Sequence, residues 1–247
     1  MACTINASIT STGLINSGDA TGNLSLQSDG ITGLSINNGG KVVLANTALS
    51  TASAGTLEYD GGELYFTPIS TERGLISNMQ YYRLNSPVVG TNGTGAQTVF
   101  GVGVTLSSNT IYQFQAVINL IKTAGTTSHS VSTRFGGTAT LNNIVYNVAG
   151  ADGNGTWGTS GSGGAYRGVA FNAATAVAVT GTGLIAATQV VWLTMTGTVS
   201  VNVGGTFIPQ YSLSAAPGGA YSTQIGSHFL IYPVGAAGSN TSIGTWA

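Results

Sequence analysis

The residues best suited to chemistry are three carboxylates on one short segment, Glu58, Asp60 and Glu63. Paired carboxylates cleave glycosidic bonds when a cleft holds them at a fixed separation. Here they flank an Asp60-Gly61-Gly62 sequence, which is typical of a tight turn between strands and not of a cleft. We therefore interpret the three carboxylates as part of a solvated turn, with an ion held between three chains as a minor alternative.

Other catalytic or metal-binding patterns are weak. His129 and His228 have no cysteine or repeated acidic residue nearby, so each is expected to be a strand residue with one satisfied hydrogen bond. We find no defensible Ser–His–acid arrangement and no phosphate-binding loop followed by a lysine. Cys3 is the only cysteine, which excludes an intrachain disulfide and a thiolate metal cage. We expect no catalytic residue, no metal ligand and no cofactor, and conclude that the chain is not an enzyme.

A glycine-rich segment, 150–164, is a better candidate for binding. It is expected to be a loop longer than ordinary connections, and it holds Trp157 together with Asp152 and Asn154. A tryptophan on a polar loop can stack on a sugar ring while the neighbouring polar side chains bond to its hydroxyls. The alternative, which we favour, is that Trp157 packs back over the fold and the rest of the loop is a spacer.

The first 78 residues predict short antiparallel strands. Apolar and polar residues alternate at period two between residues 24 and 44, with Asp-Gly and Asn-Gly turn signals between the runs. The clearest hairpin is 55–67, where the apolar residues of both strands can share one side. These strands are too few and too short to bury a core alone, so copies from other chains are the expected partners.

Residues 79–247 contain longer runs without helical periodicity. We expect strands at 81–84, 98–100, 111–121, 129–135, 138–148, 168–179, 189–203, 207–213 and 228–234. Eight or more turn-separated strands predict a β-sandwich of the jelly-roll kind. Trp192 and Trp246 lie in or beside apolar strand patterns, and we expect them in the core or at a trimer interface. The predicted fold class is all-β, with a hairpin-rich N-terminal region followed by this head.

Charge is scarce in this chain. Charged residues make up 5% of it, against about a quarter in ordinary domains, and residues 168–247 contain no Asp, Glu, Lys or Arg. The surface must therefore be neutral, or hidden against other subunits, as in structural and adhesive β proteins. The six basic residues are scattered, so nucleic acid is not an expected partner. The sequence shows no signal peptide and no membrane-length apolar run, which indicates synthesis in a cytosol and use in an assembly.

Several segments together carry a family resemblance. They are 101–112, 122–129, 135–144 and 232–246, preceded by 17–27 and the 55–67 hairpin. The later segments are similar to the C-terminal head domain of tail-fibre-like virion proteins from bacteriophages, especially phages of marine bacteria and cyanobacteria. The earlier ones resemble the region that precedes this head. The resemblance covers most of the chain.

The resemblance implies a virion protein that is commonly trimeric, with a slender attachment region and a jelly-roll head but no enzymatic activity. We expect a homotrimeric short fibre or spike whose residues 1–78 attach to other virion proteins, while 79–247 face outward, where host-surface glycan is a candidate partner. Because the sequence has no long shaft, a capsid decoration protein or head fibre is the alternative. A carbohydrate-binding module is a further alternative, and a depolymerase ranks last because most of the head lacks acidic residues.

Overall fold

The computed structural model describes residues 24–28, 31–69, 72–153, 165–170, 175–181, 183–238, 243 and 246. All regular elements among these residues are β-strands, which confirms the predicted all-β fold. The chain divides into two compact units, Met1–Ile76 and Ser77–Ala247. The division lies two residues before the boundary expected from the sequence.

The N-terminal unit contains two three-stranded antiparallel sheets. Their strands are β1 (Leu24–Ser28), β2 (Ile31–Ile36) and β3 (Val42–Leu44) in one, and β4 (Thr56–Tyr59), β5 (Leu64–Thr67) and β6 (Gly74–Ile76) in the other. Asparagine and aspartate close the tight turns, as the sequence predicts. The Asn37 Oδ1 atom accepts hydrogen bonds from the N–H groups of Gly39 and Lys41, both at 3.1 Å. Gly40 has a φ of 70°, which glycine adopts without strain.

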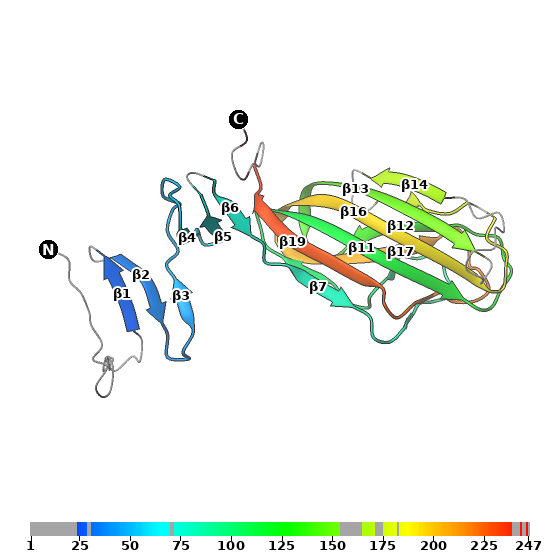
Figure 1. Ribbon diagram of the computed structural model, residues 1–247. Coiled ribbons are helices and arrows are strands. Elements are labelled where there is room, and N and C mark those ends of the chain that lie inside the picture. Colours follow the sequence, from blue (N-terminus) through cyan, green and yellow to red (C-terminus); the bar gives the residue numbers. More distant parts are fainter. Residues whose placement is uncertain are drawn as a thin grey trace. The chain divides into compact units, whose positions relative to one another are not determined.

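The C-terminal unit is larger, and its described residues form thirteen strands. Figure 1 labels the longer ones. They are β7 (Gln80–Arg83), β8 (Val88–Val89), β9 (Gln97–Thr98), β10 (Val104–Leu106), β11 (Thr110–Lys122), β12 (Val131–Gly136), β13 (Thr140–Gly153), β14 (Ala165–Ala170), β15 (Val177–Ala178), β16 (Gln189–Val203), β17 (Gly205–Leu213), β18 (Ser222–Thr223) and β19 (His228–Ala236). The large sheet runs β14-β13-β16-β11, followed by β19 and β18, which pair with β7 and β8 respectively. The small sheet runs β10-β17-β12-β15, with β9 also on β17.

The strand order is that of a jelly roll. Three strands of the jelly roll are interrupted, and each is therefore formed by two consecutive elements. These pairs are β7 with β8, β9 with β10, and β18 with β19. The eight resulting strands then lie in the order 1-8-3-6 in one sheet and 2-7-4-5 in the other. The hairpin β13–β14 is an addition between the fourth and fifth strands, and it extends the large sheet past β16. The predicted sandwich is confirmed, and β13–β14 is its main elaboration.

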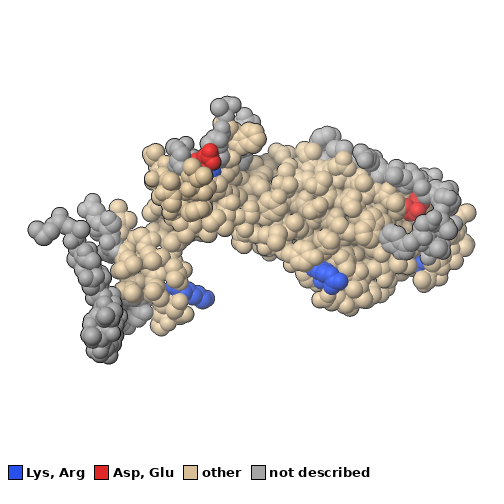
Figure 2. All heavy atoms as spheres, viewed as in Figure 1, with Lys and Arg blue, Asp and Glu red and all other residues tan. Residues whose placement is uncertain are grey.

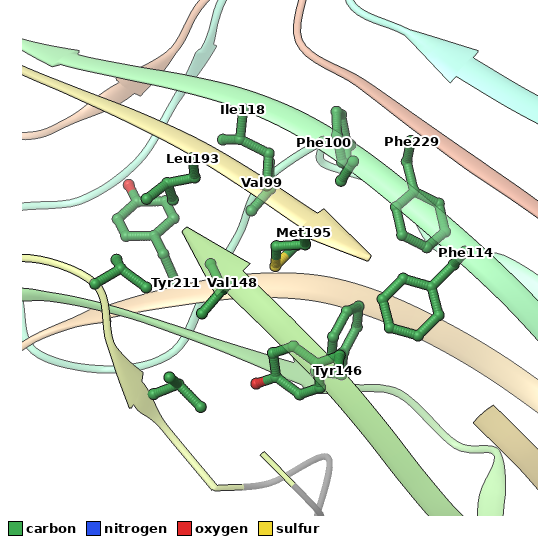
Figure 3. Packing of buried hydrophobic residues seen from close by; sticks show 14 of the residues in the cluster. Val99, Phe100, Phe114, Ile118, Tyr146, Val148, Leu193, Met195, Tyr211 and Phe229 are labelled. Carbon is green, nitrogen blue, oxygen red and sulfur yellow. The ribbon is translucent and has the colours of Figure 1, made fainter. Parts of the chain in front are cut away.

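Aromatic and aliphatic side chains together fill the space between the two sheets (Figure 3). Phe114 from the large sheet meets Phe135 from the small sheet at a ring-centroid distance of 5.1 Å. Phe135 stacks on its neighbour Phe207 at 4.5 Å, and Tyr146 of the added hairpin meets the edge of Phe135 at 5.1 Å. All four side chains are fully buried. The alternation read from the sequence therefore has a plain cause: every second residue of the long strands enters this core.

One predicted strand is wrong. Residues 168–179 were expected to form a single strand, but they contribute to β14 in the large sheet and to β15 in the small one. The composition of the segment is strand-like throughout, and alternation alone carries no information on which sheet each half joins.

Candidate functional site

One face of the first sheet of the N-terminal unit carries a cluster of six apolar side chains. Its members are Leu24, Leu26, Leu34, Ile36, Val42 and Leu44. The register pairs Leu24 with Ile36 and Ile36 with Val42, and it pairs Leu26 with Leu34 and Leu34 with Leu44. Residues that pair directly across strands point to the same side, so these six form one surface. Val42 is 65% exposed and Leu26 51% exposed, so this face lies half open to solvent.

The second sheet of the same unit repeats this arrangement. The register pairs Leu57 with Phe66, and it pairs Tyr59 with Leu64 and Leu64 with Ile76. Leu57, Phe66 and Ile76 are each more than two-fifths exposed. The opposite side of the sheet carries Glu58, Tyr65 and Thr67, which are far better covered.

We call these two surfaces the apolar faces of the N-terminal unit. Each belongs to a sheet with a single layer of strands, and a stable sheet normally packs its apolar side against a second layer. Covering a side chain that is half exposed contributes roughly 1 kcal/mol, from the usual 1.5–3 kcal/mol for full burial of a large apolar residue. No side chain on either face is charged, so an identical copy can pack there without burying a charge.

Two of the three carboxylates singled out from the sequence, Glu58 and Asp60, make contacts that stabilise the second sheet. Glu58 forms an ion pair with Arg73 at 2.5 Å, and its other oxygen accepts hydrogen bonds from the backbone N–H and hydroxyl of Ser50. These bonds from Ser50, and to a lesser degree Arg73, lower the pKa of Glu58. Glu58 therefore joins Ser50 to Arg73 and does not face a second carboxylate across a cleft.

Asp60 closes the turn between β4 and β5. Its Oδ1 atom accepts hydrogen bonds from the N–H groups of Gly62 and Glu63 at 2.9 and 2.8 Å. Partial burial alone would raise the pKa of Asp60, but these hydrogen bonds outweigh it and the pKa is lowered. Glu63 is only 8% exposed, and burial together with the nearby charge of Asp60 raises its pKa. The interpretation of a solvated turn is therefore wrong for Glu63.

A buried lysine lies at the end of the jelly roll where β11 finishes. Lys122 is 1% exposed, and its ammonium group donates to the carbonyl oxygens of Gly125 at 2.7 Å and Ala186 at 2.5 Å. The carbonyls of Ala124 and Ala187 lie at 3.3 Å. The four acceptors come from two separate connections, so Lys122 ties these loops together. Burial lowers its pKa. Sequence reasoning overlooked it; the one usable signal was a lysine at the inward-facing end of an alternating strand.

His129 lies in the same buried region. Its Nδ1 atom lies 2.7 Å from the carbonyl oxygen of Thr127 and its Nε2 atom 2.9 Å from the hydroxyl of Tyr221. Both ring nitrogens thus have partners, one more than expected from the sequence. Burial lowers the pKa of His129, and the charge of Lys122 acts in the same direction, against the hydrogen bond to Thr127. A neutral imidazole that donates from Nδ1 and accepts at Nε2 fits this environment.

The candidate glycan contacts are only partly placed. Trp157 and Asn154 lie outside the described residues. The expectation that Asp152 belongs to a loop is wrong, because β13 continues to Gly153 and pairs Asp152 with Val191. Val191 is fully buried, so Asp152 faces the inner side of the sheet, where burial raises its pKa and its charge acts on Tyr221.

Neither of the other two tryptophans is a core residue of the single chain. Trp192 is half-buried on the outer face of the large sheet, since its neighbours Val191 and Leu193 point into the core. Trp246 is 83% exposed. The core part of that expectation is wrong because alternation puts Trp192 on the opposite side. The trimer-interface part stays a prediction.

The described residues hold no group of three or more His, Cys, Asp or Glu side chains able to bind a metal ion. Nor does any helix there reach the length and apolarity needed to cross a membrane. Comparison of the chain with protein-family models, curated proteins and solved structures found no match.

Proposed function

We propose that the chain is a structural protein of a bacteriophage virion, assembled as a homotrimer through its N-terminal unit and exposing the jelly roll as a head. The observation that carries this proposal is the pair of apolar faces on β1–β3 and β4–β6, each half open to solvent. Exposed apolar surface of this kind marks an interaction site. Closed symmetry brings identical faces together and leaves none uncovered.

The head supports the same role. Jelly rolls build viral capsid and lectin domains. The face of the head that Figure 2 shows carries few charged side chains, and residues 168–247 contain no Asp, Glu, Lys or Arg. The resemblance of the sequence to tail-fibre-like proteins supports a bacteriophage particle, and other virion proteins are the partners that we propose for the N-terminal unit. A net charge of −1 keeps electrostatic repulsion small when copies gather on one particle.

Two neighbouring valines allow a matched test of the assembly. Val42 lies on the apolar face of the first sheet, whereas Val43 pairs with Ser35 on the opposite side. Both are exposed in the single chain, so neither change should prevent folding. Light scattering after size exclusion should give the wild type a mass near three times the 24.7 kDa chain. Val42→Asp should reduce the mass to one chain, because three carboxylates would meet in an apolar interface.

Val43→Asp should keep the mass of the trimer. A wild-type monomer at micromolar concentration would overturn the proposed assembly, as would equal masses for the two aspartate variants. The location on the particle is a separate question. Electron microscopy of particles bearing gold-labelled protein should show the label on the tail for a fibre or spike, and spread over the capsid for the alternative decoration role.

A further inference from the structure

The outer face of the large sheet carries a grid of neutral polar side chains. Gln113 and Gln115 of β11, Thr196 and Thr198 of β16, and Asn147 of β13 are all exposed. The register pairs Gln113 with Thr198, and it places Gln115, Thr196 and Asn147 in one row. Directly paired residues share a face, so the five side chains point outward together from strands that lie side by side (Figure 1).

These five side chains keep their hydrogen-bonding capacity for solvent or a ligand. In the described part of the chain, none of them forms a side-chain hydrogen bond. Amides and hydroxyls each offer both donors and acceptors. None of the five is charged, and Figure 2, drawn in the same view as Figure 1, shows the middle of these strands without charged side chains.

A shallow depression of about 390 Å³ lies within this grid. Its lining includes Gln113, Val145, Asn147, Thr196, Gly197 and Thr198. Gly197 adds no side chain, and Val145, which is 43% exposed, adds an apolar contact. The site therefore combines a hollow, polar groups at its margin and a small apolar surface.

Two tyrosines border the grid on its β19 and β7 side. Tyr232 pairs with Gln113 and is partly exposed. Tyr81 pairs with Leu230, which itself pairs with Gln115, and is 55% exposed. Both tyrosines therefore lie on the same outer face. From β19 to β13 the face spans roughly 14 Å, three strand spacings, which leaves room for a short oligosaccharide.

We infer that this face binds a neutral oligosaccharide. Sugar hydroxyls both donate and accept, which matches amides and hydroxyls, and the apolar side of a sugar ring packs on a tyrosine ring. A polyanion would require Lys or Arg. An extended peptide or a helix would require a free strand edge or an apolar groove. The inference rests on the proposed function, in which the jelly roll is an exposed head, and gives that head a ligand.

An array of neutral oligosaccharides of glucose, galactose, mannose and N-acetylglucosamine, probed with the full chain, tests this site. At least one oligosaccharide should bind. Calorimetric titration with that oligosaccharide should show roughly tenfold weaker binding for the Gln115→Ala/Asn147→Ala double variant, because two direct hydrogen bonds are lost. The melting temperature should not change, because both side chains are exposed. Gln210→Ala is the matched control, since Gln210 faces outward on β17 of the small sheet.

Absence of binding to every oligosaccharide, or a double variant that binds as the wild type does, overturns the inference. Light scattering on the same samples separates it from the proposed assembly. A trimer that binds no glycan overturns the glycan site alone, and a monomer that binds one overturns the assembly alone. If Thr198→Arg lowers the mass of the assembly, another copy covers this face and the glycan site is overturned as well.

Discussion

Replacing the buried Lys122 by methionine should markedly destabilise the jelly roll. Methionine is similar in length and apolar, so it fills the same space without the charge. The change removes an ammonium group that bonds to four backbone carbonyls, two of which accept at 2.5 and 2.7 Å. Hydrogen bonds to a charged group contribute about 1.5–3 kcal/mol each, so the two short ones alone account for roughly 3–6 kcal/mol.

An opposing effect reduces this figure. Burying an ammonium group costs several kcal/mol even after the protein relaxes, and methionine avoids that cost. We therefore expect a net loss of about 2–4 kcal/mol in the free energy of unfolding. Urea titrations followed by tryptophan fluorescence should show a midpoint lower by about 1 M, given a denaturant slope of roughly 2–3 kcal/mol per M.

Lys41→Met is the matched control, because Lys41 is exposed on the N-terminal unit and should tolerate the same change within about 0.5 kcal/mol. Hydrogen exchange adds a local measurement. The connections at 123–130 and 183–188 should exchange faster in the Lys122 variant, since the ammonium group no longer joins them. A methionine variant as stable as the wild type, or more stable, would refute the reasoning and show that desolvation outweighs the hydrogen bonds.

Two further predictions concern the same end of the sandwich. Burial and the charge of Lys122 lower the pKa of His129 in the folded chain, so as the pH falls below about 6.5 the unfolded chain takes up a proton at this residue first. The free energy of unfolding should therefore be at its full value above that pH and decline below it. A urea midpoint independent of pH between 7 and 5 would contradict this. Gly125→Ala should lower the free energy of unfolding by on the order of 3 kcal/mol, because Gly125 has a φ of 82° and an added Cβ would collide with the carbonyl of Pro217. The measurement is the melting temperature. Gly33→Ala is the control, because there is open space around Gly33.

The strands of the jelly roll were predictable because most of their residues alternate between apolar positions that face the core and polar positions that face outward. Residues 189–203 alternate between the core and the outside, and the structure gives β16 the predicted bounds. The 55–67 hairpin was equally clear, since Asp60 accepts hydrogen bonds from two N–H groups of the turn and Gly61 has a φ of 94°, which favours glycine. Local chemistry decides both elements, so no knowledge of distant residues was needed.

Elements that depend on distant contacts were missed. Gly150 belongs to the glycine-rich segment that the sequence predicts to be a loop, yet it lies in β13, where an added Cβ would meet the Val179 carbonyl oxygen at 2.5 Å. The glycine permits a close approach between chain segments, which sequence spacing does not reveal. Lys122 is a similar case, because the carbonyls of Ala186 and Ala187 that satisfy its charge lie more than sixty residues away.

The scarcity of charge affects two kinds of surface differently: the apolar faces of the N-terminal unit and the polar outer face of the large sheet. The apolar faces of the N-terminal unit carry no charged side chain, and an identical copy can cover them without a desolvated charge. The outer face of the large sheet is equally neutral but stays hydrated through amides and hydroxyls, so it can remain open to water while the apolar faces are covered. A charged residue such as Arg83 is tolerated on the edge strand β7, where water is available. Low charge therefore does not require every surface to be buried. It favours association between subunits where the side chains are apolar, and it favours weak, exchangeable contacts where the side chains are polar.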